Sequence, residues 1–228
     1  MGAIIPLGDA SRGLRGPRGS AIVTILLIVT NALVFFQELQ GGNRFVNAWS
    51  VIPYRVTHGQ HTITLLTSMF MHASWMHIIG NMIFLWAFGP AMEDAMGHFS
   101  YLVFYLAGGL IAMMGQVLGD PNSHVACLGA SGAIAAVMGA FIITYPRDRI
   151  RTLVWFLIFI RVTYIPAIFL IGFWILIQLF DFGAVAEANT GGVAYLAHIC
   201  GFAFGVVLSR MFVDKNRIAL TRRPYGYQ

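Results

Sequence analysis

Residues 100–119 read SYLVFYLAGGLIAMMGQVLG, an uninterrupted stretch of twenty residues without a charged side chain. A helix that crosses the hydrocarbon core of a bilayer needs about 20 mostly apolar residues. The whole chain of 228 residues has the same character, because 58% of it is hydrophobic and only 10% is charged. Soluble domains keep about 25% charged residues on their wet surfaces. The sequence therefore predicts a polytopic membrane protein of the all-α class.

The charged positions divide the chain into six candidate membrane helices. The apolar stretch 153–160 is closed by Arg161 and is too short to span, so we expect a loop that dips into or lies on the membrane face. The first outer loop, about 40–74, is the longest, and its aromatic and apolar content favours embedding in the outer leaflet. The six predicted spans are roughly 21–39, 75–92, 100–119, 129–145, 165–182 and 192–213.

The basic residues predict the orientation of these spans. An excess of 14 Lys and Arg over 9 Asp and Glu would suggest a nucleic-acid partner in a soluble protein. In a membrane protein such residues gather in cytoplasmic loops. Here they precede the first span, join the fourth to the fifth and follow the sixth, so we expect no nucleic-acid partner and cytoplasmic termini. This predicts a cytoplasmic segment 1–20, a membrane domain 21–213 and a basic cytoplasmic tail 214–228.

Polar side chains inside the predicted spans point to a reaction centre. Polar groups are costly in a bilayer, so each one calls for a reason. Ser131 lies between Gly129 and Gly132 at the start of the fourth span, and His198 lies near the outer end of the sixth. Both spans run from outside to inside, so at about 1.5 Å per residue the two side chains reach similar, shallow depths. We predict that they meet in one water-accessible cavity, with His198 as general base for the nucleophile Ser131.

The residues around His198 indicate how the histidine is held. Gly201 and Gly205 form a small-residue ridge one turn below it, which permits close packing against the fourth span. All nine acidic residues fall in loops or at span ends and none lies beside His198, so we predict a Ser-His dyad without a carboxylate. The sequence contains no HExxH motif, which disfavours a zinc protease, so we expect no metal.

A further polar cluster opens the second span. His77 and Asn81 are four residues apart and share one helix face. Both can donate hydrogen bonds, so together with the backbone N–H of Ser131 they predict an oxyanion site. His72 lies on the outer-loop side of His77, and we interpret it as a structural residue that ties the loop down.

Two pairs of residues keep more than one interpretation. Trp174 and Gln178, one turn apart on the fifth span, are either core or part of a gate, and the core interpretation is ahead. Cys127 and Cys200 have neither metal-binding spacing nor a disulfide framework. We interpret Cys200 as a small packing residue and assign no role to Cys127.

Over most of its length the sequence resembles the rhomboid family of intramembrane serine proteases. The start, Ile5-Pro6-Leu7, is similar to bacterial members. The other stretches that carry the resemblance are His72–Asn81 (HASWMHIIGN), Glu93–Gly97 (EDAMG), Gly129–Ile134 (GASGAI) and Ala197–Gly205 (AHICGFAFG).

The resemblance implies a six-helix rhomboid bundle and an activity. It implies a dyad of Ser131 and His198 with an oxyanion site at His77 and Asn81. The expected reaction is hydrolysis of peptide bonds in or near transmembrane segments of membrane-anchored substrates, without metal, nucleotide or other cofactor. The expected partners are transmembrane proteins and the lipid bilayer, and the expected location is the cytoplasmic membrane of a bacterium.

The resemblance also implies two mobile elements, and the sequence departs from the family pattern at one position. The loop at about 183–191 corresponds to a cap, and the fifth span around Trp174 to a helix that opens sideways for substrate. Some family members carry an aromatic ring one turn after the serine, stacked on the histidine. That position is Ala135 here, so the sequence leaves open what supports the ring of His198.

Two other function classes are alternatives to a protease. A catalytically silent rhomboid-like protein that binds or escorts membrane helices would need neither Ser131 nor His198. A transporter or channel would call for intramembrane carboxylates or broken helices with internal symmetry, and the sequence contains no such charges and no inverted repeat.

Overall fold

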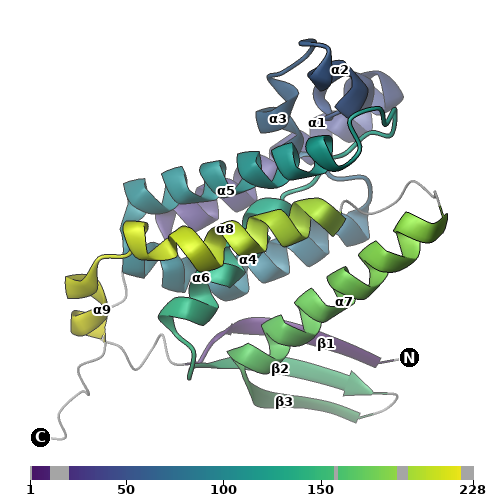
Figure 1. The fold of residues 1–228 in the computed structure, drawn as a ribbon. Coiled ribbons are helices and arrows are strands. Elements are labelled where there is room, and N and C mark those ends of the chain that lie inside the picture. Colours follow the sequence, from purple (N-terminus) through teal and green to yellow (C-terminus); the bar gives the residue numbers. More distant parts are fainter. Residues whose placement is uncertain (1, 11–20, 157–158, 189–194, 222–228) are drawn as a thin grey trace, which may run out of the picture.

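In the computed structural model the chain forms a bundle of helices with a small sheet at one end (Figure 1). The structure describes residues 2–10, 21–156, 159–188 and 195–221. The arginines expected before the first span and Arg222 and Arg223 lie outside these ranges. In chain order the elements are β1 (Gly2–Asp9), α1 (Ile22–Trp49), α2 (Pro53–Thr57), α3 (Thr64–Thr67), the 3-10 helix η2 (Ser68–Phe70), α4 (Trp75–Met96), α5 (His98–Gly119), α6 (Ser131–Thr144), β2 (Arg149–Phe156), β3 (Phe159–Pro166), α7 (Ala167–Ala188), α8 (Tyr195–Phe212) and α9 (Lys215–Thr221).

A long helix occupies each of the six predicted spans, so the mostly helical membrane fold is confirmed. By length and composition, α1, α5 and α8 are able to cross a membrane, whereas α6 and the segment Ala167–Gln178 of α7 are shorter apolar helices. The number of six crossings stays a prediction. Two boundaries differ from expectation: α1 continues past a break at Gly42, where φ is 55°, and α7 extends to Ala188, into the expected cap loop.

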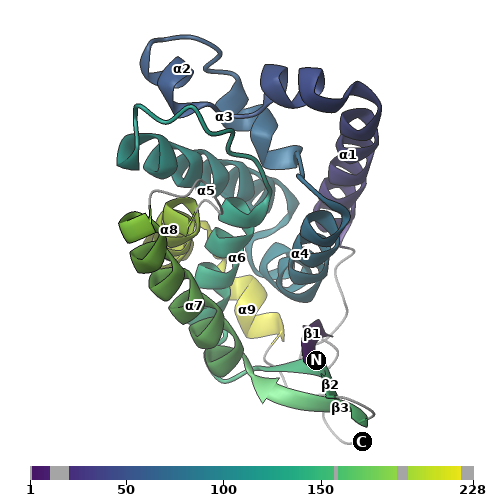
Figure 2. The ribbon, with the colours of Figure 1, turned by 90° about the vertical axis from the view of Figure 1, so that its right-hand side faces the viewer.

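The shortest of these helices, α6, lies at the centre of the bundle. Its 14 residues rise about 21 Å at 1.5 Å per residue, less than the roughly 30 Å of a hydrocarbon core. Every residue from Gly132 to Phe141 is buried, and Figure 2 shows α6 surrounded by α4, α5, α7 and α8. Neighbouring helices enclose α6, so it does not have to be long enough to span the bilayer by itself. Ser131, its first residue, therefore lies inside the bundle.

Glu93 fixes the start of α1 to the end of α4. Its carboxylate accepts hydrogen bonds from the backbone N–H groups of Val23 and Thr24, each over 2.8 Å, and from the Thr24 hydroxyl over 2.7 Å. The ring of His98 lies 2.6 Å away on the same carboxylate. The first N–H groups of a helix have no partner within the helix. Glu93, which is 1% exposed, therefore caps α1 from another element.

The expected loop at 153–160 is wrong, because residues 153–156 belong to β2 and residues 159–160 belong to β3. β2 pairs antiparallel with both β1 and β3, and Thr152 faces Thr163 in the register. Side chains alternate along β2, so Ile150 and Thr152 are fully buried while Trp155 is exposed on the opposite face. An apolar run too short to span a bilayer is long enough for strands, and here the N-terminal β1 provides the partner.

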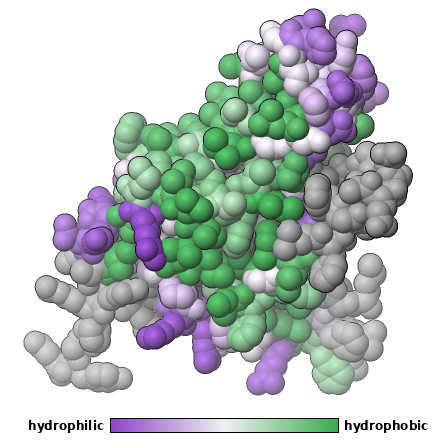
Figure 3. Space-filling view, viewed as in Figure 1, coloured by the Kyte–Doolittle hydropathy of each residue, from purple (hydrophilic) through white to green (hydrophobic). Residues whose placement is uncertain are grey.

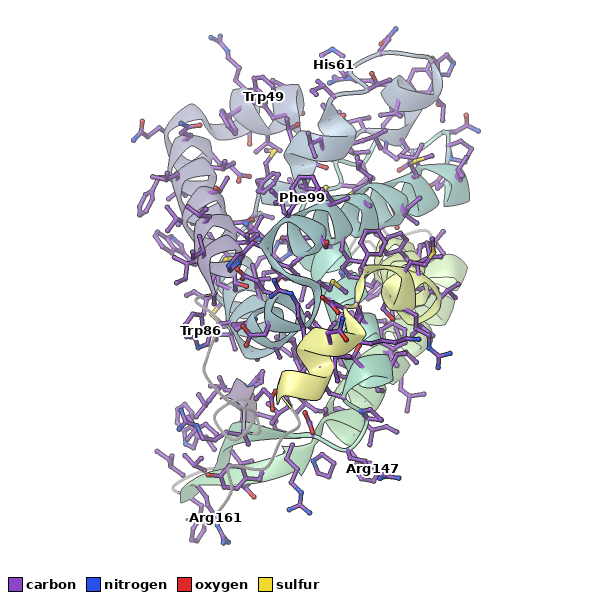
Figure 4. All side chains as sticks on the ribbon, turned by 90° about the vertical axis from the view of Figure 1, so that its left-hand side faces the viewer. Trp49, His61, Trp86, Phe99, Arg147 and Arg161 are labelled. Atoms are coloured by element: carbon purple, nitrogen blue, oxygen red, sulfur yellow. The ribbon has the colours of Figure 1, made fainter. Side chains whose placement is uncertain are left out.

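The surface of the bundle has the distribution expected in a bilayer. Figure 3 shows hydrophobic side chains over the middle of the molecule and hydrophilic ones toward two ends, near α2 and near α9. Trp86 lies between these ends in Figure 4 and is 47% exposed. Trp49 and His61 lie at one end, and Arg147 and Arg161 at the end that holds the sheet. The chain is an integral membrane protein, and the cytoplasmic placement of its termini stays a prediction.

Candidate active site

The turn before Ser131 is shaped by Gly129. The φ of Gly129 is 135°, a conformation that residues with a Cβ rarely adopt. Its N–H donates a hydrogen bond to the carbonyl oxygen of Ser68 over 2.9 Å. A Cβ on Gly129 would lie 2.9 Å from Cε1 of His77 and 3.5 Å from Oγ of Ser131. Glycine therefore serves both the backbone conformation and the approach of His77 to Ser131.

The imidazole of His198 lies against the hydroxyl of Ser131. The distance between Nε2 of His198 and Oγ of Ser131 is 2.6 Å, which is the length of a hydrogen bond. His198 is 6% exposed, and Ser131 is partly buried. The two residues come from helices 67 positions apart in the chain, and the structure brings them together as the sequence analysis expects.

The contact depends on the close approach of α6 and α8. A Cβ on Gly201 would lie 2.1 Å from the carbonyl oxygen of Gly132, and one on Gly205 would lie 2.0 Å from that of Ala136. These carbonyl groups are part of the α6 backbone and cannot move aside. The predicted packing of the glycine ridge against the fourth span is confirmed, and it sets the distance across which His198 reaches Ser131.

Gln178 makes a contact that its sequence-based interpretation as core or gate does not include. Its Oε1 lies 2.5 Å from Nδ1 of His198, on the side of the ring opposite to Ser131. Among the described residues, Gln178 and Ser131 are the hydrogen-bond partners of the His198 ring. The signal was present as an amide in an otherwise apolar span, one turn from Trp174. The expectation that helix packing alone holds His198 is therefore incomplete.

Trp174 provides the ring that is absent at position 135. Its indole centroid lies 5.4 Å from the His198 centroid, with 47° between the planes. Ala135 is fully buried among the helices. The aromatic contact to the histidine thus comes from α7 and not from α6, a substitution that the sequence of α6 could not reveal.

His77 and Asn81 lie on the face of α4 that borders the same cavity as Ser131. Ser74 caps α4 by accepting a hydrogen bond from the backbone N–H of His77 over 3.2 Å, which fixes the first turn. The side-chain nitrogen of Asn81 is buried and has no hydrogen-bond partner among the described residues. A buried donor without a partner is costly, so it is available to a group that enters the cavity.

His72 lies beside this site. Its ring is 5.1 Å from the His77 ring, at an interplanar angle of 69°. Its backbone N–H donates to the carboxylate of Glu38 on α1 over 2.9 Å, so the loop is tied down as the structural interpretation expects. Burial, aided by the neighbouring His77, lowers the pKa of His72 to about 3, so the ring is neutral near pH 7.

These residues surround a cavity of about 920 Å³. Its volume is large enough for several residues of an extended peptide or for a drug-sized molecule. Within the part of the chain that the structure describes, no group of three or more His, Cys, Asp or Glu side chains is placed to hold a metal ion. The lining includes Ser131, His198, His77, Asn81, Trp174 and Gln178, together with Ala126 and Leu128 from the segment between α5 and α6.

The arrangement has the parts that acyl transfer requires. The hydroxyl of Ser131 contacts the imidazole of His198, and the imidazole in turn contacts the amide of Gln178. The polar side chains of His77 and Asn81 on α4 border the same cavity.

Comparison with known families matches residues 59–215 of this chain to the rhomboid domain. YdcA, a rhomboid-type protein of Bacillus subtilis (strain 168), is 26% identical over 200 residues, which are 86% of this chain and 90% of YdcA. Rhomboid protease GlpG of Salmonella choleraesuis (strain SC-B67) is 27% identical over 193 residues, which are 84% of this chain and 63% of GlpG. Rhomboid protease GluP of Bacillus subtilis is 28% identical over 137 residues, or 58% of this chain and 26% of GluP.

The matched domain covers well over half of the chain. It contains the residues that border the cavity from α4, α6, α7 and α8. The chain therefore belongs to the rhomboid family and is an intramembrane protease of the serine endopeptidase class.

Proposed function

We propose that this protein hydrolyses peptide bonds in or near the transmembrane segments of membrane-anchored proteins, with Ser131 as nucleophile and His198 as general base. The observation that carries the proposal is the 2.6 Å contact between Oγ and Nε2 inside a membrane helix bundle. A serine hydroxyl becomes an effective nucleophile when an adjacent base takes its proton.

The proposed reaction has two steps. The Ser131 hydroxyl donates its proton to Nε2 of His198 while Oγ attacks the substrate carbonyl carbon, and the imidazolium then protonates the leaving amine. Water, activated by the same neutral imidazole, hydrolyses the acyl-enzyme and restores Ser131. Each step needs Nε2 without a proton at the start, so Nδ1 must hold the ring proton.

His77, Asn81 and the backbone N–H of Ser131 are proposed to stabilise the tetrahedral oxyanion. The unpartnered Asn81 nitrogen and the closeness of His77 to Gly129 support this role. Ser131 is the first residue of α6, where N–H groups lack helical partners and the helix dipole favours negative charge. Preorganised donors of this kind stabilise charge that develops only in the transition state.

The substrates are proposed to be single-span membrane proteins that are cut near the outer end of the span. The cavity is bordered by Val46 in the last turn of α1, by Ala73 just before α4 and by Leu128 just before α6, all at the end opposite to the sheet. With the basic clusters on the cytoplasmic side, both termini would lie in the cytoplasm of a bacterium and the cavity would open toward the outer face.

The test uses the purified full chain and a single-span model substrate in proteoliposomes. The wild type should cut the substrate and react with a fluorophosphonate probe, and Ser131→Ala should do neither. Ser209→Ala is a matched control, because Ser209 is fully buried on α8 and does not line the cavity. Equal cleavage by the wild type and Ser131→Ala would refute the proposal, and a wild type that neither cuts nor reacts would indicate a silent family member.

A further inference from the structure

Both side chains that support the His198 ring come from a single helix, α7. Gln178 contacts Nδ1, and Trp174, one turn earlier, lies beside the same ring in a tilted arrangement. The opposite face of α7 is apolar and open, with Phe169 69% and Phe173 63% exposed. One face of α7 thus serves the site, while the other is suited to lipid.

The contacts of Gln178 indicate which end of its amide meets the histidine. Its Nε2 points to the carbonyl oxygen of Trp174, 3.5 Å away on the preceding turn. Its Oε1 therefore faces Nδ1 of His198 at 2.5 Å. An amide oxygen is an acceptor only, so Nδ1 must carry the ring proton and Nε2 is left free to accept from Ser131.

We propose that Gln178 is the positioning residue of the general base, filling with a neutral amide the place that a carboxylate holds in a Ser-His-Asp triad. The amide selects the reactive tautomer and fixes the ring orientation. A buried carboxylate would do so at the cost of a permanent charge within the membrane, and the amide avoids that cost. The inference rests on the proposed protease function, and it implies that His198 is aligned only while α7 is packed against α8.

The experiment compares Gln178→Met with Gln178→Glu in the full-length protein. Met keeps the length of the side chain but removes the acceptor. We expect turnover of the model substrate and reaction with the fluorophosphonate probe to fall about tenfold to a hundredfold, with KM unchanged, because the Nδ1–H is left without a partner. Glu keeps an acceptor oxygen, so it should restore most of the rate at pH 8. A carboxylate beside the imidazole favours its protonated form, so the acid limb of the pH profile should move to higher pH.

Gln116→Met is the matched control. Gln116 is also an amide that contacts α8, but its Oε1 accepts from the backbone N–H of Ala197 over 3.3 Å and does not touch the ring. It should change the melting temperature without changing the rate. Wild-type rates for Gln178→Met, or an equal loss in Gln178→Met and Gln178→Glu at every pH, would overturn the inference. Absence of any wild-type activity would instead count against the proposed function.

A second inference comes from the face of the sheet that points away from the helices. In the register of β2 and β3, Arg151 pairs with Tyr164 and Trp155 pairs with Ile160, and all four side chains are exposed. Arg149 and Arg151 lie on this face of β2, and neither strand contains an acidic residue. β3 runs directly into α7, whose first residues expose Ile168 and Phe169 in turn. Aromatic, aliphatic and basic groups therefore form one surface that continues onto a membrane helix.

We infer that this face binds the anionic headgroups of the adjacent leaflet. Trp and Tyr side chains prefer the interface between hydrocarbon and water, where one end is apolar and the other is wet. Arginines beside them meet the negative surface potential of anionic lipids. The occupant is thus the membrane surface itself, because it alone extends from the lipid-facing side of α7 to the basic end of the sheet.

The test places a fluorescent label at Val162→Cys, on the same face, in a full chain with Cys127 and Cys200 replaced by alanine. In nanodiscs that contain phosphatidylglycerol, nitroxide-bearing lipid should quench the label, and less so in Arg149→Gln/Arg151→Gln. Thr62→Cys, exposed at the other end of the molecule, should respond to a water-soluble quencher. Quenching of Val162→Cys by the soluble agent alone would overturn the inference, and so would protection from both quenchers.

Discussion

The two sides of His198 are held by different means. On one side, α6 and α8 approach so closely that the carbonyl groups of Gly132 and Ala136 occupy the space of any side chain at Gly201 and Gly205. On the other side, α7 reaches the ring through the long side chains of Gln178 and Trp174. Gly172 of α7 has nothing within 4 Å of the position of its Cβ, which shows how open this helix is.

This difference means that the position of the His198 ring and its orientation are set by different helices. Backbone contacts between α6 and α8 set the distance between the serine and the histidine, and this distance cannot change without unpacking the core. Side-chain contacts from α7 set the rotation and tautomer of the ring, and these can be lost while the core stays intact. Changes on the first side should therefore act on folding, and changes on the second on turnover.

The largest effect is expected from Gly205→Val. Its Cβ would lie 2.0 Å from the Ala136 carbonyl oxygen and 2.9 Å from the Ala140 nitrogen. Overpacking against a rigid backbone should lower the free energy of unfolding by more than about 3 kcal/mol, seen as a collapse of the thermal unfolding midpoint in detergent. Gly172→Ala on α7 is the control and should leave the midpoint unchanged or slightly raised. A stable, active Gly205→Val protein would break the comparison.

The next effect concerns the donors on α4. Asn81→Ala and His77→Ala should each lower turnover about 10²–10³-fold, or roughly 2.7–4 kcal/mol, with a small change in stability. Asn31→Ala provides the contrast, because Asn31 is fully buried and donates to the Leu27 carbonyl on α1 over 2.7 Å. It should lower the unfolding midpoint and leave specific activity intact. The opposite pattern would make His77 and Asn81 structural residues.

The smallest effect is expected from Trp174→Leu. Loss of the aromatic contact, worth about 0.5–1.5 kcal/mol, should slow turnover by roughly twofold to tenfold. The unfolding midpoint should barely move, because α7 is the open side of the site. Phe173→Leu removes a neighbouring ring that is 63% exposed and should have no effect on either measurement. A large loss of stability in Trp174→Leu would show that α7 is part of the rigid core.

Much of the helical architecture could be predicted because lipid imposes simple rules on sequence. The predicted span 129–145 encloses α6 (Ser131–Thr144), and 192–213 encloses α8 (Tyr195–Phe212). The juxtaposition of Ser131 and His198 followed from equal depth on parallel helices. Glycine at 201 and 205 indicated which helices approach closely, since only small residues permit backbone contact.

The sheet and the support of His198 were beyond the reach of such rules. β1 pairs with β2 across a long stretch of the chain, as in Ile4 with Val154, which are 150 positions apart. The N-terminal segment has no local sequence pattern that predicts its pairing with β2. Gln178 was visible as a polar residue in an apolar span, but whether it points to a core, a gate or the ring of His198 depends on the rotation of α7 about its axis.

The sequence by itself determined that this chain is a membrane protein and which polar residues its spans contain, because polar groups are costly in lipid and their positions are therefore conspicuous. Only the tertiary structure decided how the base is held, since that depends on which side chains of α7 face α8. Nδ1 of His198 lies 2.5 Å from Oε1 of Gln178, and the ring centroids of His198 and Trp174 are 5.4 Å apart. Both are set by the packing of three helices, and no single helix encodes them.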